Sequence, residues 1–353
     1  MENNSIFKGL KILELSSVLA GPAVGMFFAE LGATIIKIEN KTTHGDITRK
    51  WKLPEEDPNI EYSAYYLSTN WGKEIIFSDL RNPTDKEHIY SLIKECDIVI
   101  SNFKQDSAIK LQFDYSKIKS LNPKVIYGQI QAYSDAPQMA GFDAKIQAET
   151  GWMYMNGQSE GPPTKIPVAI IDLMAAHQLK EGILVALIHR FKTGLGSKVT
   201  TSLFDSAIAS LANQGSSYLN NNIIPVRKGS LHPTISPYGE TFKTSDGYYI
   251  LLAIGTDKQF ELMCSAFSIV IEGYNTNHSR VKYRQQLGKI LQISFLKFNK
   301  IEVEKISKQH NLPISSIKNL DEVFDNPYTK NLILKYKHDP NLKCLKTVSF
   351  KID

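Results

Sequence analysis

The sequence predicts an α/β fold with a parallel sheet, and two observations support this. Short apolar runs alternate with helical stretches over the first 200 residues, the arrangement of strand–helix–strand units. Beyond about residue 220 the pattern changes to a polar stretch, a hairpin signal and a group of helices. We therefore expect a Rossmann-like large domain, its sheet covered by helices on both faces, and a smaller α+β domain.

The elements of the large domain follow in chain order. The apolar run 10–15 (LKILEL) predicts a buried first strand, and 16–21 forms a turn. A helix begins at Pro22, because proline suits the first helical turn, and Gly32 ends it. The run 33–39 (ATIIKIE) predicts the second strand. Further strands are predicted at 75–80, 97–103 and 125–133, with a helix at 83–95.

The longest helical stretch, 172–189, follows a strand-like run at 166–171. Asparagines at 220–222 mark the end of the large domain, which we assign to 1–220 with a return at about 315–353. The smaller domain is assigned to 225–312. Its predicted elements are strands at 239–242 and 248–253 around a turn at 243–247, and helices at about 257–267, 279–298 and 301–309.

Composition excludes several classes of function. The net charge of +5 arises from 41 basic and 36 acidic residues with no basic block, so no nucleic-acid partner is expected. Cys96, Cys264 and Cys344 are far apart and match no disulfide or metal-ligand spacing. The first fifteen residues lack a secretory signal pattern, and polar residues interrupt the longest apolar helix. We expect a cytoplasmic protein with reduced thiols, no metal and no membrane partner.

The first strand–turn–helix is a candidate anion site. The segment 15–22 (LSSVLAGP) lacks GxGxxG, so it does not match the dinucleotide fingerprint. The free N–H groups at the start of a helix can still bind an anion. The alternative is a tight connection in which Gly21 serves backbone geometry alone.

Asp172 is the candidate nucleophile. It stands at the head of the long helix, where aspartate commonly caps the backbone N–H groups. The cap and the nucleophile are compatible roles, because a helix start favours the ionised carboxylate. An ionised carboxylate in an apolar surround can attack a thioester.

Many short motifs occur in one register along the chain. They are Leu19 to Pro22, Leu31 to Glu39, Gly45-Asp46 with Arg49, Asn70 with Lys73, Asp97 to Phe103, Gly141 to Asp143 with Gln147-Ala148 and Gly151, Ile171-Asp172, Ala186 to Ile188 with Arg190, Thr193 to Gly196, Arg227 to Gly229, His232-Pro233, Pro237-Tyr238 and Asp246-Gly247. In this order they resemble the class III CoA-transferases, the family of formyl-CoA transferase and carnitine CoA-transferase. The resemblance runs from about Gly9 to about Thr329.

The resemblance implies a CoA-transferase that moves CoA from an acyl-CoA to a carboxylic acid. Asp172 would carry a covalent anhydride and then an aspartyl-CoA thioester, so coenzyme A is a substrate and neither ATP nor a metal is needed. It also implies an obligate homodimer of two interlocked, ring-like chains. The implied CoA contacts are Val18, Leu19, Ala20, Asn102, Phe103, Lys110 and Leu111, with Lys110 at a phosphate. The implied substrate loops contain Phe142, Asp143 and Gly229.

The sequence departs from the family pattern at Asn40, at the turn 104–106 and in ending at Asp353. An α-methylacyl-CoA racemase is one alternative, but Phe142 stands where racemases carry a histidine. A non-catalytic CoA-binding subunit of a heteromeric transferase is the other. The altered turn and the end of the chain favour it, whereas the retained Asp172 argues against it. The donor and acceptor stay open, with succinyl-CoA or another short dicarboxyl-CoA as the working expectation.

Overall fold

The computed structural model describes residues 6–352; residues 1–5 and 353, the two ends of the predicted large domain, lie outside the described part. The chain forms two compact units. The first contains residues up to Trp152, then Lys165–Ile224 and the residues from Lys330 onward. The second contains Met153–Thr164 and Pro225–Thr329.

The first unit is built on a six-stranded sheet with the order β3-β2-β1-β4-β5-β6, in which all neighbours are parallel. Its strands are β1 (Lys11–Leu15), β2 (Thr34–Asn40), β3 (Lys73–Ser78), β4 (Ile98–Ser101), β5 (Ile126–Gln131) and β6 (Ser197–Ser202). The predicted parallel sheet is therefore confirmed. The sequence did not indicate β6, because its serines, lysine and threonines (SKVTTS) lack the apolar character of the other strands.

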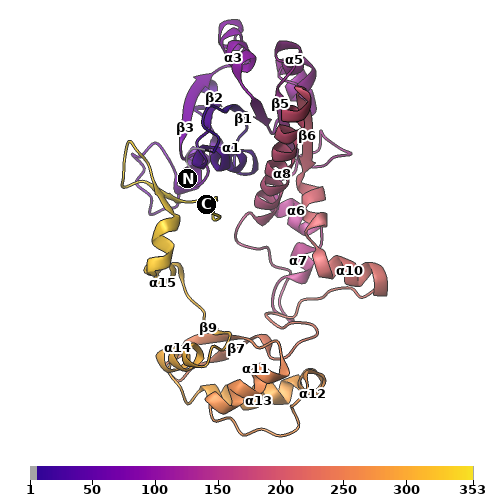
Figure 1. The fold of residues 1–353 in the computed structure, drawn as a ribbon, viewed down its shortest axis with the longest axis vertical. Coiled ribbons are helices and arrows are strands. Elements are labelled where there is room, and N and C mark those ends of the chain that lie inside the picture. Colours follow the sequence, from indigo (N-terminus) through magenta and orange to yellow (C-terminus); the bar gives the residue numbers. More distant parts are fainter. Residues whose placement is uncertain (1–5, 353) are drawn as a thin grey trace. The chain divides into compact units, whose positions relative to one another are not determined.

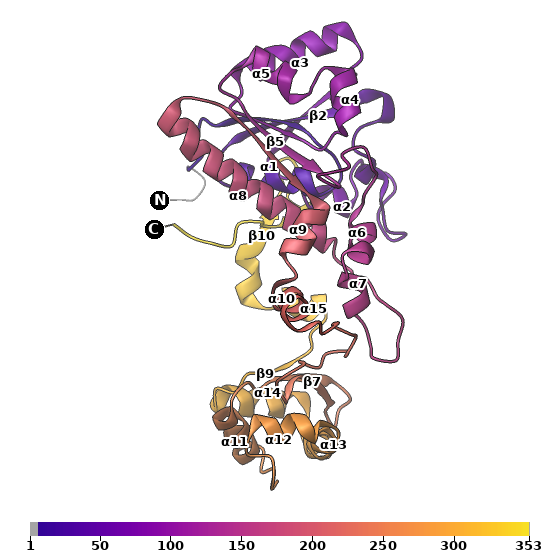
Figure 2. The same cartoon turned by 90° about the vertical axis from the view of Figure 1, so that its right-hand side faces the viewer.

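Helices cover both faces of this sheet, as expected, with α1 (Ala20–Glu30) and α8 (Ile170–Thr193) on one face (Figures 1 and 2). The opposite face is covered by α3 (Pro83–Glu95) and α5 (Tyr115–Leu121), whose isoleucines pack on β1 and β5. The helix α1 begins two residues before the predicted Pro22. Shorter helices of this unit are α2 (Ala64–Leu67), α4 (Gln105–Leu111), α6 (Asp143–Glu149), α9 (Leu203–Ala209) and α10 (Ala212–Asn221), and η2 (Lys41–Thr43) and η3 (Ile47–Lys50) are 3₁₀ turns.

Two smaller pieces complete the description of this unit. The hairpin β10 (Ile333–Lys335) and β11 (Lys343–Leu345) is antiparallel and comes from the end of the chain. Tyr336 between these strands donates a hydrogen bond to the Leu67 carbonyl at 2.8 Å. The short helix α7 (Trp152–Met155) and the 3₁₀ turn η4 (Pro327–Leu332) lie where the chain passes between the units.

The strand predicted at 166–171 is wrong. Residues 165–169 have no regular structure and α8 already begins at Ile170. The backbone N–H of Ile166 donates to the Gln147 side chain at 2.9 Å rather than to a neighbouring strand. The apolar run resembles a strand, but side-chain acceptors bind the N–H groups at its two ends, those of Ile166 and Ile171.

The second unit is a small α+β structure with its own core of buried apolar side chains. Its antiparallel sheet has the order β7-β8-β9, with β7 (Tyr238–Lys243), β8 (Tyr249–Ala253) and β9 (Ile314–Ser316). The predicted hairpin is confirmed, but the helix predicted at 279–298 is two helices that meet at Tyr283. The helices of this unit are α11 (Asp257–Ala266), α12 (Asn277–Lys282), α13 (Arg284–Phe295), α14 (Lys300–Gln309) and α15 (Leu320–Phe324).

Within residues 6–352, no helix is long and apolar enough to cross a bilayer. In the same part of the chain, no three histidine, cysteine or acidic side chains gather in a way that could hold a metal ion.

Candidate active site

Asp172 lies in the first turn of α8, but it is not the cap of that helix. The N-cap residue is Ala169, and no side chain caps it. The Asp172 side chain is half-buried, and none of the groups in residues 6–352 donates a hydrogen bond to its carboxylate. The interpretation of Asp172 as a helix cap is therefore wrong.

Burial raises the pKa of Asp172 to about 7, and the negative charge of Asp143 adds to the effect. The expectation that the helix start keeps this carboxylate fully ionised is therefore also wrong. A helix dipole stabilises an anion most when N–H groups also bond to it, and here such bonds are missing. The result is a carboxylate whose pKa is raised toward neutral pH, a property common among catalytic groups.

Asp143 and Gln147 hold the start of α8 in place. Asp143 is buried at the first position of α6, and one of its carboxylate oxygens accepts from the Ile171 N–H at 2.7 Å. Its other oxygen accepts from the Gln147 amide at 2.6 Å, and Gln147 in turn accepts from the Ile166 N–H. Asp143 thus takes the capping bond that Asp172 was expected to make.

Tyr65, which the sequence analysis did not single out, is close enough to Asp172 to be affected by its charge. Burial and the charges of Asp172, Asp143 and Asp46 raise the pKa of Tyr65 to about 12, so its hydroxyl stays a hydrogen-bond donor. The ring of Tyr65 meets that of Trp51 edge-on, with centroids 5.1 Å apart. These two rings provide an apolar wall and a donor near the candidate nucleophile.

The turn after β1 meets the segment after β4 at the point where the strand order reverses. Ligands of open α/β sheets bind at this switch point. The Ser17 N–H donates to the Asn102 side chain at 3.2 Å, and the Asn102 amide donates back to the Ser17 carbonyl at 2.9 Å. The next residue, Val18, has a left-handed backbone (φ 71°) and donates its N–H to Asp46 at 3.1 Å.

A buried ion network lies behind this turn. Lys37, in the middle of β2, contacts Asp46 at 2.9 Å and Glu14 at 3.5 Å. Lys73 pairs with Glu14 at 2.7 Å, and Arg49 pairs with Glu39 at 2.7 Å. All six side chains are at most 5% exposed, so each charge depends on its partners for stabilisation.

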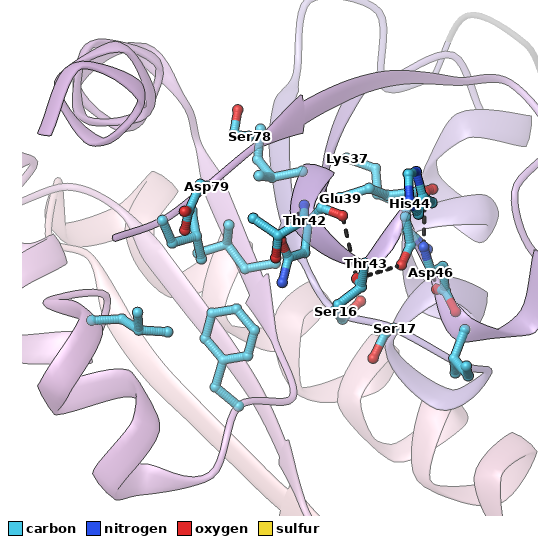
Figure 3. Close-up of a pocket in the computed structure, with 18 of the residues that line it drawn as sticks. Ser16, Ser17, Lys37, Glu39, Thr42, Thr43, His44, Asp46, Ser78 and Asp79 are labelled. Carbon is cyan, nitrogen blue, oxygen red and sulfur yellow. Dashed lines mark hydrogen bonds and ion pairs between the residues drawn. The ribbon is translucent and has the colours of Figure 1, made fainter. Parts of the chain in front are cut away.

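A pocket of about 760 Å³ opens beside the turn in the first unit (Figure 3). Lys37 and Asp46 lie at one end of it near Ser17, and Ser78 and Asp79 lie toward the other end. Its remaining lining includes the half-buried Phe103, together with Leu15, Ser16, Ile38, Glu39, Asn40, Thr42, Thr43, His44, Gly45, Ile47, Lys50, Leu80, Arg81 and Leu111.

The predicted CoA contacts fall into three groups. Phe103 and Leu111 line the pocket. Val18 belongs to the turn next to it, Asn102 follows β4 and bonds to that turn, and the neighbouring Leu19 and Ala20 are buried at the start of α1. Lys110 is exposed on α4 and is not among the residues that line the pocket.

The predicted substrate-loop residues differ in their surroundings. Phe142 is 65% exposed as the residue before α6, whereas Asp143 is buried. Gly229 belongs to the second unit, where its N–H donates to the Gly157 carbonyl at 2.9 Å. Its φ of 58° suits glycine, and a Cβ there would lie 2.8 Å from the Gln158 side chain.

Two signals in the sequence could have indicated the ion network and the tyrosine near Asp172. A lysine within the apolar strand 33–39 requires a buried acidic partner, which predicts an ion network around Lys37. Three tyrosines at 62, 65 and 66 form an aromatic cluster before Asn70, as expected of a binding surface. Neither signal identifies the partner residue without the fold.

Comparison with known proteins identifies the family. Residues 7–351 match the family described as CoA-transferase family III. A succinate–glutarate CoA-transferase of Agrobacterium fabrum is 36% identical, with 90% of this chain and 82% of that protein covered. The human succinyl-CoA:glutarate CoA-transferase is 32% identical, with 96% and 77% covered.

The same relationship is found among solved structures. A CAIB/BAIF family protein from Brucella suis superimposes with a TM-score of 0.87 at 32% sequence identity, and 98% of this chain and 93% of that chain are covered. The predicted resemblance to class III CoA-transferases is confirmed, and the chain belongs to CoA-transferase family III.

Proposed function

We propose that this protein transfers CoA from an acyl-CoA to a carboxylic acid, with Asp172 as the nucleophile. The observation that carries the proposal is a half-buried carboxylate in the first turn of α8 with no hydrogen-bond donor among the described residues and a pKa raised to about 7. A carboxylate without donors keeps its lone pairs free for attack on a carbonyl.

The reaction would proceed in four steps. The Asp172 carboxylate attacks the donor thioester carbonyl, the C–S bond breaks, and CoA leaves as a thiolate while the acyl group and Asp172 form a mixed anhydride. The thiolate attacks the aspartyl carbonyl and releases the donor acid as its carboxylate, leaving an aspartyl-CoA thioester. The acceptor carboxylate attacks this thioester to form a second anhydride and free thiolate. The thiolate then attacks the acceptor carbonyl and regenerates the Asp172 carboxylate.

We assign CoA to the pocket beside the turn after β1. Phe103 and Leu111 offer an apolar wall for the adenine, and a cavity of about 760 Å³ is of the size that binds a cofactor. Lys50 and Arg81 also line it and can face the CoA phosphates, with Lys110 nearby in sequence on α4. These cations would compensate for Asn40, which stands where the resemblance implies a basic residue or a proline.

Short dicarboxylic acids are the proposed donor and acceptor acids, because the two relatives described above are named for succinate and glutarate. We also propose a cytoplasmic homodimer of interlocked chains, with the two units as its domains. Val185, Ile188 and Phe191 on α8 are 58–92% exposed and support a partner surface there. Light scattering of the purified protein tests the dimer.

The function is tested by incubating the protein with succinyl-CoA and glutarate and following glutaryl-CoA by liquid chromatography. Turnover by the wild type and its loss in Asp172→Asn, with the dissociation constant for CoA within about threefold, support the proposal. CoA binding without turnover on any acid would favour a non-catalytic subunit. Exchange of the α-proton of a 2-methylacyl-CoA with deuterated water would favour a racemase, for which Phe142 offers no proton-transfer group.

A further inference from the structure

Val18 is held in a backbone conformation that valine rarely adopts. Its φ of 71° lies in the left-handed region, where the branched side chain crowds the backbone. A residue in such a state needs its surroundings to hold it there. Val18 follows Ser17 and precedes Leu19, the N-cap residue of α1, so its conformation sets where that helix begins.

Asp46 provides the contact that holds this backbone. Both of its carboxylate oxygens face the Val18 N–H, at 3.1 and 3.4 Å. Asn102 fixes only the preceding residue, through the N–H and carbonyl of Ser17. The left-handed residue itself therefore depends on Asp46.

Asp46 is in turn held rigidly and kept ionised. One oxygen accepts from Lys37 at 2.9 Å, and the other accepts from the Thr48 backbone and hydroxyl at 3.0 and 2.8 Å. Burial acts to raise the pKa of Asp46, but Lys37 and these hydrogen bonds outweigh it, so the pKa lies below its ordinary value. The acceptor of the Val18 N–H is thus a fixed anion 4% exposed to solvent.

The Asp46 carboxylate is connected to the proposed site in two ways. Asp46 lines the pocket together with Ser17 (Figure 3). Its charge also acts on Tyr65, as does that of Asp172. A change in the Val18 turn therefore alters the wall of the pocket rather than a distant part of the fold.

We propose that Asp46 is a positioning residue that holds Val18 in its left-handed conformation and thereby shapes the turn against which CoA binds. The inference rests on the proposed function, since it assigns CoA to this pocket. In this proposal Asp46 acts through the turn and not on the reacting carbonyl, so its loss should change the affinity for acyl-CoA more than the turnover number.

A double-mutant cycle between Asp46 and Val18 tests this directly. Asp46→Asn should raise the KM for succinyl-CoA about tenfold with kcat changed less than about threefold, because the neutral amide holds the N–H less firmly. Glycine adopts a left-handed φ without strain, so a turn with Val18→Gly needs Asp46 less. Asp46→Asn in the Val18→Gly background should therefore raise KM less than about threefold relative to Val18→Gly alone.

Glu240→Gln is the matched control, because Glu240 is a buried carboxylate of the second unit paired with Arg284 at 3.0 Å. Its substitution should lower Tm without changing KM, and Val18→Gly should not alter its effect. Should Asp46→Asn fail to fold, Asp46→Glu keeps the charge for Lys37 but displaces the acceptor, and the same pattern is expected. An equal rise in KM in both Val18 backgrounds overturns the inference.

The dissociation constant of CoA itself, from isothermal titration, separates this inference from the proposed function. If the wild type transfers no CoA to any acid but binds CoA, the proposed function is wrong, and the same cycle read from the dissociation constant of CoA in place of KM still decides the role of Asp46. If the wild type binds no CoA, both the proposed site and the inference are overturned.

Discussion

Asp46 and Asp172 are the same residue type in the same unit, and the fold treats them in opposite ways. Asp46 accepts hydrogen bonds from Val18, Lys37 and Thr48, and its pKa lies below the ordinary value. Asp172 has no donor among residues 6–352, and burial together with the charge of Asp143 raises its pKa to about 7. The Asp46 carboxylate accepts hydrogen bonds on both oxygens and fixes the backbone, whereas the Asp172 carboxylate accepts none from the described residues and can react.

This contrast explains why the local sequence does not predict the role of either Asp46 or Asp172. Asp172 has the sequence position of a helix cap, but Asp143, 29 residues earlier in the chain, makes the capping bond to Ile171. Asp46 looks like an ordinary turn residue, but Lys37 and the Val18 N–H surround it. Partners that are distant in sequence decide the role of each carboxylate.

Breaking the buried ion network around Lys37 and Asp46 should give the largest effect on stability. Lys37→Met removes the cation shared by Asp46 and Glu14, which leaves buried carboxylate charge uncompensated. We expect a loss of about 3 kcal/mol of unfolding free energy, from the usual cost of breaking a buried pair. At about 2.1 cal/mol/K of unfolding entropy per residue, Tm should fall by roughly 4 °C in a thermal melt followed by circular dichroism.

Lys11→Met is the control, because Lys11 pairs with Glu95 on the surface at 3.0 Å with both side chains more than half exposed. A surface pair contributes less than about 1 kcal/mol. Equal losses in the two variants would contradict the view that the network around Lys37 is structural.

Substitution of the unpaired carboxylate, Asp172, should raise the stability of the protein rather than lower it. The pKa of Asp172 is raised in the folded chain, so folding is favoured while this group is protonated and that contribution is lost as pH rises through about 7. Asp172→Asn removes this charge and should stabilise the protein at pH 8 by roughly 1 kcal/mol, which raises Tm by about 1–2 °C. The gain should shrink as the pH is lowered to 5.

Asp114→Asn serves as the comparison, since Asp114 is a true cap that accepts from the Ser116 and Lys117 N–H groups before α5. That substitution should not stabilise the protein at any pH. A lower Tm for Asp172→Asn at pH 8 would mean that Asp172 has a stabilising partner after all.

Asp143→Asn sharpens the contrast through the pH profile of kcat/KM. Asp172 must lose its proton to attack, so the rate should fall on the acidic side with a midpoint near pH 7. Removing the neighbouring negative charge lets Asp172 ionise more easily, and the midpoint should move to lower pH. Glu149→Gln, which changes an exposed charge on the same helix, should leave the midpoint unchanged.

The smallest effect is expected at the proposed phosphate contact. Lys110→Ala should raise the KM for acyl-CoA about threefold at low ionic strength and less at high salt, because salt screens an exposed charge. Lys119→Ala, on α5, is the control for the loss of one surface charge. A KM for Lys110→Ala that matches the control at both salt concentrations would remove Lys110 from the CoA site.

Much of the fold could be predicted because its signals are local. The apolar runs around Ile12, Ile35 and Ile98 predict strands, and Pro83 at the start of α3 and the turn before Tyr248 are short-range signals. The strand β6 could not be predicted, since its position at the sheet edge beside β5 permits polar residues. The break at Tyr283 depends on tertiary packing rather than on any breaker residue.

The candidate site could be predicted only in part. Asp172 was indicated by its position at the head of the long helix and by the resemblance, and Asp143 by the resemblance. The roles of Tyr65 and Asp46 could not be found, because they depend on fields and hydrogen bonds across the sheet edge. Whether a carboxylate is paired is a property of the fold and not of the local sequence.

The central claim is that the unpaired Asp172 carries the acyl group and then CoA. The most direct test is peptide mass spectrometry after the protein is incubated with succinyl-CoA and quenched with hydroxylamine. We expect a hydroxamate on Asp172 in the wild type and none in Asp172→Asn, with Asp46 unmodified in both. A hydroxamate on another residue, or turnover without any adduct, would contradict the account.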